Sequence, residues 1–170
     1  MTHKNTTQRI VIAAMMASLV CVATMVVKIP SPLNGYLNIG DCVVLLAGWM
    51  LSPAYGFLAA GIGSMLADVF SGYLIYAPAT FVIKGAMALI AYYGVKLLKE
   101  KPSKLVARIA SGTVAELFMV GGYFLFEGII YEGFLAVAVN IPANAIQGAV
   151  GLVLGCLLVT LFEKKKINLQ

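Results

Sequence analysis

The sequence predicts an all-α integral membrane protein with six transmembrane helices, both termini in the cytoplasm, and one domain covering residues 1–170. Its composition is the first reason: 61% of the residues are hydrophobic and 11% are charged, whereas soluble domains carry roughly 25% charged residues. The second reason is length, because six spans of about 20 residues with short connections use nearly the whole chain. Residues 1–9 and 163–170 are expected to be cytoplasmic tails.

Six apolar segments are expected to form these helices. They are residues 10–27, 42–51, 54–69, 79–98, 109–126 and 134–162. The second segment has about 10 residues, too few to span a bilayer alone unless the preceding loop continues it into the membrane. That loop, residues 28–41, contains two prolines and two glycines that prevent a continuous helix. At its end, Asp41 is expected to be the N-cap of the second helix.

The basic residues predict the orientation of the chain. Ten of the twelve Lys and Arg residues lie in the N-terminal tail, between the fourth and fifth segments, or in the C-terminal tail. Cytoplasmic loops carry such an excess of basic residues, so these three regions are expected in the cytoplasm. The net charge of +5 therefore needs no nucleic acid as a partner.

Small side chains line one face of the first segment. Ala13, Ala14 and Ala17 form an A-x-x-x-A spacing, which lets another helix approach closely. This face is a candidate docking site for a partner subunit, and ordinary packing inside the bundle is the alternative.

Two ionisable residues lie inside predicted spans, Lys84 in the fourth and Glu116 in the fifth. Charged groups at such depth are costly and usually face a partner or a polar cavity. They either handle a charge on a ligand or form an ion pair with each other. In the sixth segment, Asn140, Asn144 and Gln147 share one helical face. They either bind a ligand or form hydrogen bonds between helices.

With the predicted orientation, these polar residues converge on the outer half of the membrane. Amides, hydroxyls and tyrosine rings suit a small polar ring compound. The candidate substrate-binding residues are Asn38, Asp68, Tyr73, Tyr76, Lys84, Glu116, Tyr123, Asn140, Asn144 and Gln147.

Several function classes lack their sequence signals. There is no G-x-x-x-x-G-K-[ST] loop for ATP, so an energy-driven transporter needs partner subunits. The single histidine, His3, lies in the polar tail, and the three cysteines have no CxxC spacing. Neither a metal nor a cofactor is expected, and no nucleophile–base pair suggests an enzyme. A self-sufficient facilitator would need polar residues through the inner half, where the segments are nearly all apolar.

Three separated motifs resemble one family. They are GYLNIGD at 35–41, the stretch GSMLAD-VF-SGYLIYAPAT at 63–80 running into Lys84, and NIPAN at 140–144. Together they resemble the substrate-binding S component of an energy-coupling factor (ECF) vitamin transporter, in the branch of riboflavin-type and hydroxymethylpyrimidine-type components.

The resemblance implies a six-helix protein that captures a vitamin from outside and associates with a transmembrane T subunit and two ATPase subunits. It also implies that Ala13 and Ala17 belong to the docking motif. The only tryptophan, Trp49, lies in the predicted cytoplasmic half, away from the ligand. This favours a small single-ring substrate, vitamin B6 or a thiamin-precursor pyrimidine. Riboflavin and a facilitator remain the alternatives.

Overall fold

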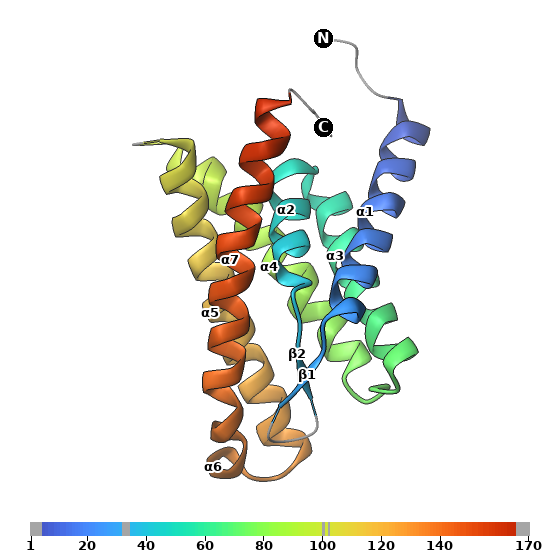
Figure 1. The fold of residues 1–170 in the computed structure, drawn as a ribbon, viewed down its shortest axis with the longest axis vertical. Helices are drawn as coiled ribbons and strands as arrows, with labels where there is room; N and C mark the ends of the chain where they lie inside the picture. The colour runs from blue at the N-terminus through green and yellow to red at the C-terminus, as the bar shows by residue number, and fades with distance from the viewer. Residues whose placement is uncertain (1–4, 32–34, 100, 102, 166–170) are drawn as a thin grey trace.

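The computed structural model describes residues 5–31, 35–99, 101 and 103–165. The chain forms a helical bundle with one short hairpin (Figure 1). In chain order the elements are α1 (Thr6–Val26), β1 (Ile29–Pro30), β2 (Tyr36–Leu37), α2 (Asp41–Met50), α3 (Pro53–Ser71), α4 (Ala77–Leu98), α5 (Lys104–Ile130), α6 (Phe134–Val137), the 3₁₀ helix η1 (Ala138–Asn140) and α7 (Ile141–Lys164).

Five helical segments in the described part of the chain are long and apolar enough to cross a membrane. They are Thr6–Val26, Pro53–Ser71, Ala77–Leu98, Lys104–Ile130 and Phe134–Lys164. The remaining expected segment, residues 42–51, corresponds to α2, which has 10 residues. At 1.5 Å per residue it is about 15 Å long, half of the roughly 30 Å hydrocarbon core. The chain is thus a multi-pass helical membrane protein, with α2 too short to be a sixth span by itself.

Several helices extend beyond their predicted ends because polar residues cap them. α1 begins at Thr6 rather than Ile10, since the Asn5 side chain accepts a hydrogen bond from the Gln8 backbone at 2.9 Å and the Gln8 side chain accepts one from the Asn5 backbone at 3.1 Å. α5 likewise begins at Lys104, after a cap by Ser103. The single helix expected at 134–162 is instead divided into α6, η1 and α7. Pro142, in the first turn of α7, lacks the N–H that a continuous helix would use.

The segment expected to be an irregular loop contains an antiparallel hairpin. Ile29 pairs with Leu37 and Pro30 with Tyr36. With two residues per strand it is too short to be stable alone. It lies at the end of the bundle opposite the termini (Figure 1), where contacts with the helices hold it.

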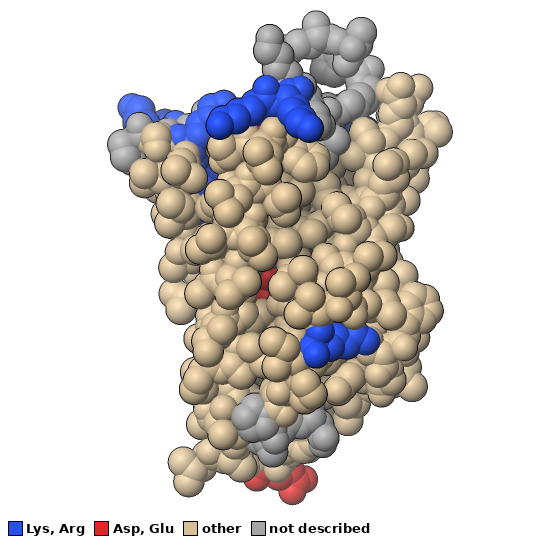
Figure 2. Space-filling view, in the orientation of Figure 1, with Lys and Arg blue, Asp and Glu red and all other residues tan. Residues whose placement is uncertain are grey.

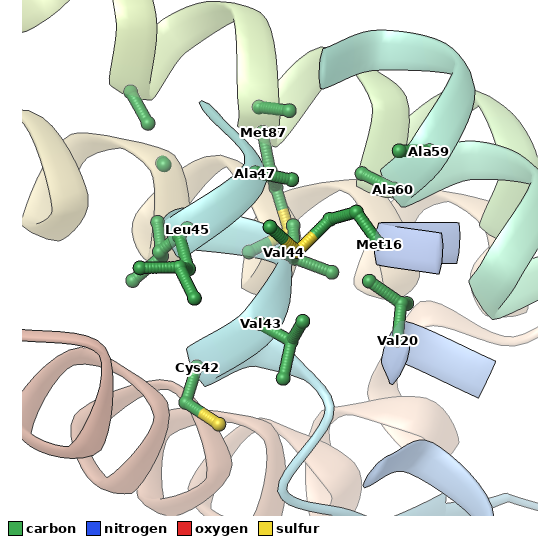
Figure 3. Close-up of a cluster of buried hydrophobic side chains, with 14 of the residues drawn as sticks. Met16, Val20, Cys42, Val43, Val44, Leu45, Ala47, Ala59, Ala60 and Met87 are labelled. Carbon is green, nitrogen blue, oxygen red and sulfur yellow. The ribbon is translucent and has the colours of Figure 1, made fainter. Parts of the chain in front are cut away.

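The short helix α2 is the centre of the bundle. It packs against α1, α3, α4 and α7, while α1 packs on α3, α3 on α4, α4 on α5 and α5 on α7. Nine of its ten residues are buried, as expected of a helix that is apolar on all sides. Figure 3 shows Val43, Val44 and Leu45 of α2 among side chains of the surrounding helices, including Met16 and Met87. The core thus fixes where Asp41, the first residue of α2, is held.

On the face that Figure 2 shows, charged side chains lie mainly at the ends of the molecule. Figure 2 shows Lys and Arg side chains gathered at the end where Figure 1 places both termini. On this face the middle is almost uncharged, apart from one basic group and a small area of acidic atoms. An uncharged band around the middle of the molecule, with charged groups at its ends, is the surface expected of a helical bundle surrounded by lipid.

Candidate functional site

A small polar cavity lies at the end of the bundle opposite the termini, between the hairpin and helices α3, α4, α5 and α7. Its volume is about 40 Å³. Its lining consists of Ser31, Gly35, Tyr36, Asn38, Asp68, Tyr73, Tyr76, Thr80, Tyr123, Glu127, Asn144 and Gln147. The hairpin, the α3–α4 connection and the helices around it therefore meet at one polar site.

Three tyrosines form a continuous aromatic wall of this cavity. The rings of Tyr36 and Tyr73 have centroids 4.8 Å apart, and those of Tyr73 and Tyr76 are 6.3 Å apart with a T-shaped arrangement. Gly72, with φ of 83°, ends α3 in the left-handed conformation that glycine adopts most easily. The resulting turn brings Tyr73 and Tyr76 back over the end of α3.

The aromatic wall has a carboxylate at each end. The Tyr36 hydroxyl donates to Asp68 Oδ1 at 2.7 Å, and the Tyr76 hydroxyl donates to Glu127 Oε1 at 3.3 Å. Asn140 donates to Glu127 Oε2 at 2.9 Å. Burial and the Asp68 carboxylate raise the pKa of the Tyr36 hydroxyl, so this phenol stays neutral and donates its proton at physiological pH.

Beneath the cavity, a chain of polar side chains leads to a buried ion pair. Gln147 Oε1 accepts from the Asn38 backbone at 3.0 Å and from its side chain at 3.3 Å. The Gln147 amide donates to Asp41 Oδ2 at 2.7 Å, and Lys84 donates to Asp41 Oδ1 in a salt bridge. The Lys84 ammonium also lies 5.4 Å from the centre of the Tyr123 ring. The cavity is therefore coupled to a charge pair inside the bundle.

This network corrects two predictions. Asp41 is not the N-cap of α2: it is the first helical residue, Gly40 is the cap, and the Asp41 carboxylate is committed to Lys84 and Gln147. The second is the alternative that Lys84 and Glu116 form an ion pair with each other: Lys84 pairs with Asp41 instead. Local sequence suggested a cap, but the packing of α2 against α4 and α7 placed Asp41 between two side-chain donors.

Glu116 lies in the same region without a hydrogen bond. Its side chain is 6% exposed, and neither carboxylate oxygen has a hydrogen-bond partner in the described part of the chain. It faces α7, where a Cβ on Gly151 would lie 3.2 Å from Glu116 Oε1 and 2.7 Å from Asp41 Cβ. Glycine at 151 thus lets α7 approach both carboxylates closely, and Glu116 interacts electrostatically with Asp41 and Lys84.

The structure brings most of the predicted site residues together. Those that line the cavity are Asn38, Asp68, Tyr73, Tyr76, Tyr123, Asn144 and Gln147. The other three lie outside its lining: Lys84 and Glu116 lie deeper, and Asn140 supports Glu127 from behind. All ten nevertheless belong to one connected region.

Five lining residues were absent from the predicted site: Ser31, Gly35, Tyr36, Thr80 and Glu127. Tyr36 and Glu127 lie in segments that the sequence predicts to be aromatic or acidic connections, although Glu127 belongs to α5, so their composition was a usable signal. Thr80 had no such signal. Its role depends on the contact between its hydroxyl and that of Tyr123, 3.0 Å apart, which joins α4 to α5.

A second hollow, the α1–α3 groove, lies on the side of the bundle. It has a volume of about 370 Å³ and is lined by Ile10, Ala13, Ala14, Ala17, Ser18, Tyr55, Leu58, Ala59, Ile62 and Leu66. Ala14 is exposed, whereas Ala13 is 8% exposed. A Cβ on Gly63 of α3 would lie 2.4 Å from the Ala17 carbonyl oxygen. The alanines therefore serve both close packing of α1 on α3 and the floor of an apolar groove.

Comparisons with known proteins place this architecture. The sequence model of the family described as ECF-type riboflavin transporter, S component, matches residues 4–164. A Pyrococcus woesei protein, described as an uncharacterized protein in the gap 3′ region, is 37% identical over 138 residues, covering 80% of this chain and 88% of that protein.

Two solved structures share the fold. The S component of a bacterial ECF transporter superposes with a TM-score of 0.76 at 24% identity, covering 94% of this chain and 98% of the other. The S component for biotin of an ECF-type ABC transporter gives 0.65 at 15% identity, covering 94% and 95%. The resemblance seen in the sequence motifs is confirmed. The chain belongs to the ECF-type riboflavin transporter S-component family, the multi-pass membrane proteins that capture vitamin substrates for ECF transporters.

Proposed function

We propose that this protein captures a small single-ring vitamin or precursor, a B6 vitamer or a thiamin-precursor pyrimidine, from outside the cell. It resides in the plasma membrane with both termini in the cytoplasm, so the polar cavity faces outward. The observation that carries this proposal is the cavity itself. Tyrosine rings, amides and carboxylates converge there, which suits stacking on a ring and hydrogen bonding to its substituents.

Ligand entry requires the hairpin to move. A cavity needs roughly 10–15 Å³ for each water, so about 40 Å³ accommodates a few waters rather than a vitamin ring. Among the described residues, the Tyr36–Asp68 and Asn38–Gln147 hydrogen bonds join the hairpin to the helices around the site. A ligand that takes over these hydrogen bonds would replace them as the hairpin moves.

Uptake is driven by a transmembrane T subunit and two ATPase subunits, since this chain has no nucleotide-binding loop. The α1–α3 groove, with Ala14 exposed in it, is the docking site that we assign to the T subunit. Its apolar lining suits close helix–helix packing within the bilayer.

Ala14→Trp tests this assignment. The indole would fill the groove, so we expect uptake by the assembled transporter to be lost while vitamin binding to the isolated protein stays within about twofold. Leu19→Trp is the matched control, because Leu19 is 46% exposed on the same helix but does not line the groove. Normal uptake by the Ala14 variant would remove the groove from the interface, and loss of binding as well would indicate misfolding.

Riboflavin is the second candidate substrate, favoured by the description of the matching family. It would enter the same cavity, with the tyrosine wall stacking on the flavin ring. A self-sufficient facilitator is the remaining alternative, and transport by the protein alone in vesicles would support it. Competition between riboflavin and single-ring vitamins for binding distinguishes the two substrates.

A further inference from the structure

The charged side chains that line the cavity are all acidic. Its lining contains two carboxylates, Asp68 and Glu127, and four tyrosines, but no Lys, Arg or His among the described residues. The two carboxyl groups are 5% and 3% exposed, so water screens them poorly. Buried charges normally have a partner of opposite charge, which makes this lining unusual.

Lys28 and Lys84 act electrostatically on Asp68, but each has a closer polar partner. Lys84 forms its salt bridge with Asp41. Lys28 is exposed at the rim, where its ammonium bonds to the Ser71 hydroxyl and lies 5.5 Å from the centre of the Tyr36 ring. Neither Asp68 nor Glu127 has a salt bridge within the described ranges of the chain; their partners are neutral hydroxyl and amide groups.

One carboxylate oxygen of Asp68 can also accept a further hydrogen bond. Its Oδ1 accepts from Tyr36, but its buried Oδ2 has no partner that meets hydrogen-bonding geometry in the described structure. The Thr80 hydroxyl is a neutral donor near this carboxyl group, and its oxygen also lies 3.0 Å from the Tyr123 hydroxyl, in a contact in which either group can donate. An unpartnered carboxylate oxygen in the wall of a cavity is suited to a charged donor on a ligand.

The aromatic wall favours the same kind of donor. Tyrosine faces carry partial negative charge and attract cations within about 6 Å, and cages of aromatic rings bind ammonium ligands in this way. Tyr36, Tyr73 and Tyr76 form a row of adjoining rings between the two carboxylates. Rings and carboxylates thus act in the same direction on a positive charge placed between them.

Resting on the proposed function, we infer that the cavity selects vitamins that carry a positive charge, on an amine or a protonated ring nitrogen, and rejects those that carry a phosphate or a carboxylate. Asp68 is the specificity-determining residue, because its free oxygen can accept the ligand's N–H. Glu127 adds attraction for the cation and repulsion for anions from the other end of the wall. Phosphorylated forms of the vitamin are therefore not substrates.

Matched ligand pairs test the inference by titration calorimetry on the full chain in detergent. The pairs are pyridoxamine with pyridoxamine 5′-phosphate, aminohydroxymethylpyrimidine with its phosphate, and riboflavin with FMN. Riboflavin carries no positive charge at neutral pH, so its pair tests the rejection of phosphate alone. Since like charges brought together cost several kcal/mol, we expect the phosphorylated member of the binding pair to bind at least about 100-fold more weakly. Equal or tighter binding of the phosphorylated member would overturn the inference while leaving the capture function intact.

Asp68→Asn gives the second readout. It removes the charge but keeps the shape, so pyridoxamine should bind roughly 10- to 100-fold more weakly, as for the loss of a charged hydrogen bond. Pyridoxine lacks the amine but shares the protonated ring nitrogen, so it should lose as much affinity as pyridoxamine if Asp68 binds the ring nitrogen, and less if Asp68 binds the amine. Glu132→Gln is the control, because Glu132 is exposed and lies outside the lining.

The remaining outcomes are also decisive. Unchanged pyridoxamine affinity in the Asp68 variant, or anion binding that depends on Lys28, would contradict the inference. If the variant does not fold, the phosphate pairs on the unmodified protein decide alone. If neither member of any pair binds, the proposed function fails and the inference falls with it.

Discussion

Replacing Lys84 by methionine should destabilise the protein strongly. Methionine keeps the length and apolar stem of the side chain, but it leaves the Asp41 carboxylate, which is 0% exposed, without its cation. Gln147 would still donate to Oδ2, so the carboxylate would lose one of two partners. Breaking a buried ion pair from one side typically costs about 3–5 kcal/mol, and we expect Lys84→Met to lie in this range.

The double variant separates the ion pair from simple packing. Asp41→Asn together with Lys84→Met removes both charges, so no buried charge is left unpaired. We therefore expect the double variant to be more stable than Lys84→Met alone, with a coupling energy of about 2 kcal/mol or more between the two positions. Reversible unfolding in mixed micelles, followed by the fluorescence of Trp49, measures the free energy of unfolding of the unmodified protein, the two single variants and the double variant.

The control is a salt bridge at the surface. Lys104 lies 3.9 Å from Glu163, with its side chain 58% exposed, and exposed pairs typically contribute about 0–1 kcal/mol. Lys104→Met should therefore change stability little. If Lys84→Met cost no more than this control, or if the coupling energy were near zero, Asp41 would not depend on Lys84, and the account of the buried network would be wrong.

Three further substitutions test other parts of the bundle. Glu116→Gln should leave stability within about 1 kcal/mol or raise it, because no hydrogen bond is lost and a buried carboxylate is removed; a loss above about 3 kcal/mol in unfolding would show that the carboxylate has a stabilising partner. Gly151→Leu should destabilise by at least about 1–3 kcal/mol through overpacking against Asp41, and wild-type stability would mean that α7 lies farther from α2. Asn144→Ala should weaken vitamin binding by about 1–3 kcal/mol if the ligand bonds to this amide in the cavity lining; unchanged affinity in calorimetry would assign Asn144 to packing.

The sequence predicted what depends on local composition. Apolar segment length and the placement of basic residues led to the long helices, because both follow from the energetics of the bilayer. Boundaries were less accurate where polar caps extend a helix, as at Asn5 and Ser103. The break before Pro142 was missed because a proline in the first turn is compatible with both a new helix and a kinked one.

The sequence predicted which residues belong to the candidate site better than it predicted which of them interact with each other. Polar residues in apolar segments stand out, so Lys84, Asp68 and Gln147 could be found from the sequence. Their partners could not, since Lys84 and Asp41 are 43 residues apart and Gln147 and Asp41 are 106 apart. Such pairs are decided by how α2 packs among its neighbours, and tyrosines such as Tyr36 acquire a role only when the hairpin folds over the cavity.

The most direct test of the capture function is mass spectrometry of small molecules that co-purify with the detergent-solubilised protein, followed by calorimetric titration of each molecule found. We predict a B6 vitamer or an aminopyrimidine, without phosphate, bound with submicromolar affinity, and lost affinity in variants of the cavity lining. A flavin would keep the capture function and change the substrate. If no vitamin co-purifies and none binds on direct titration, the central claim is contradicted.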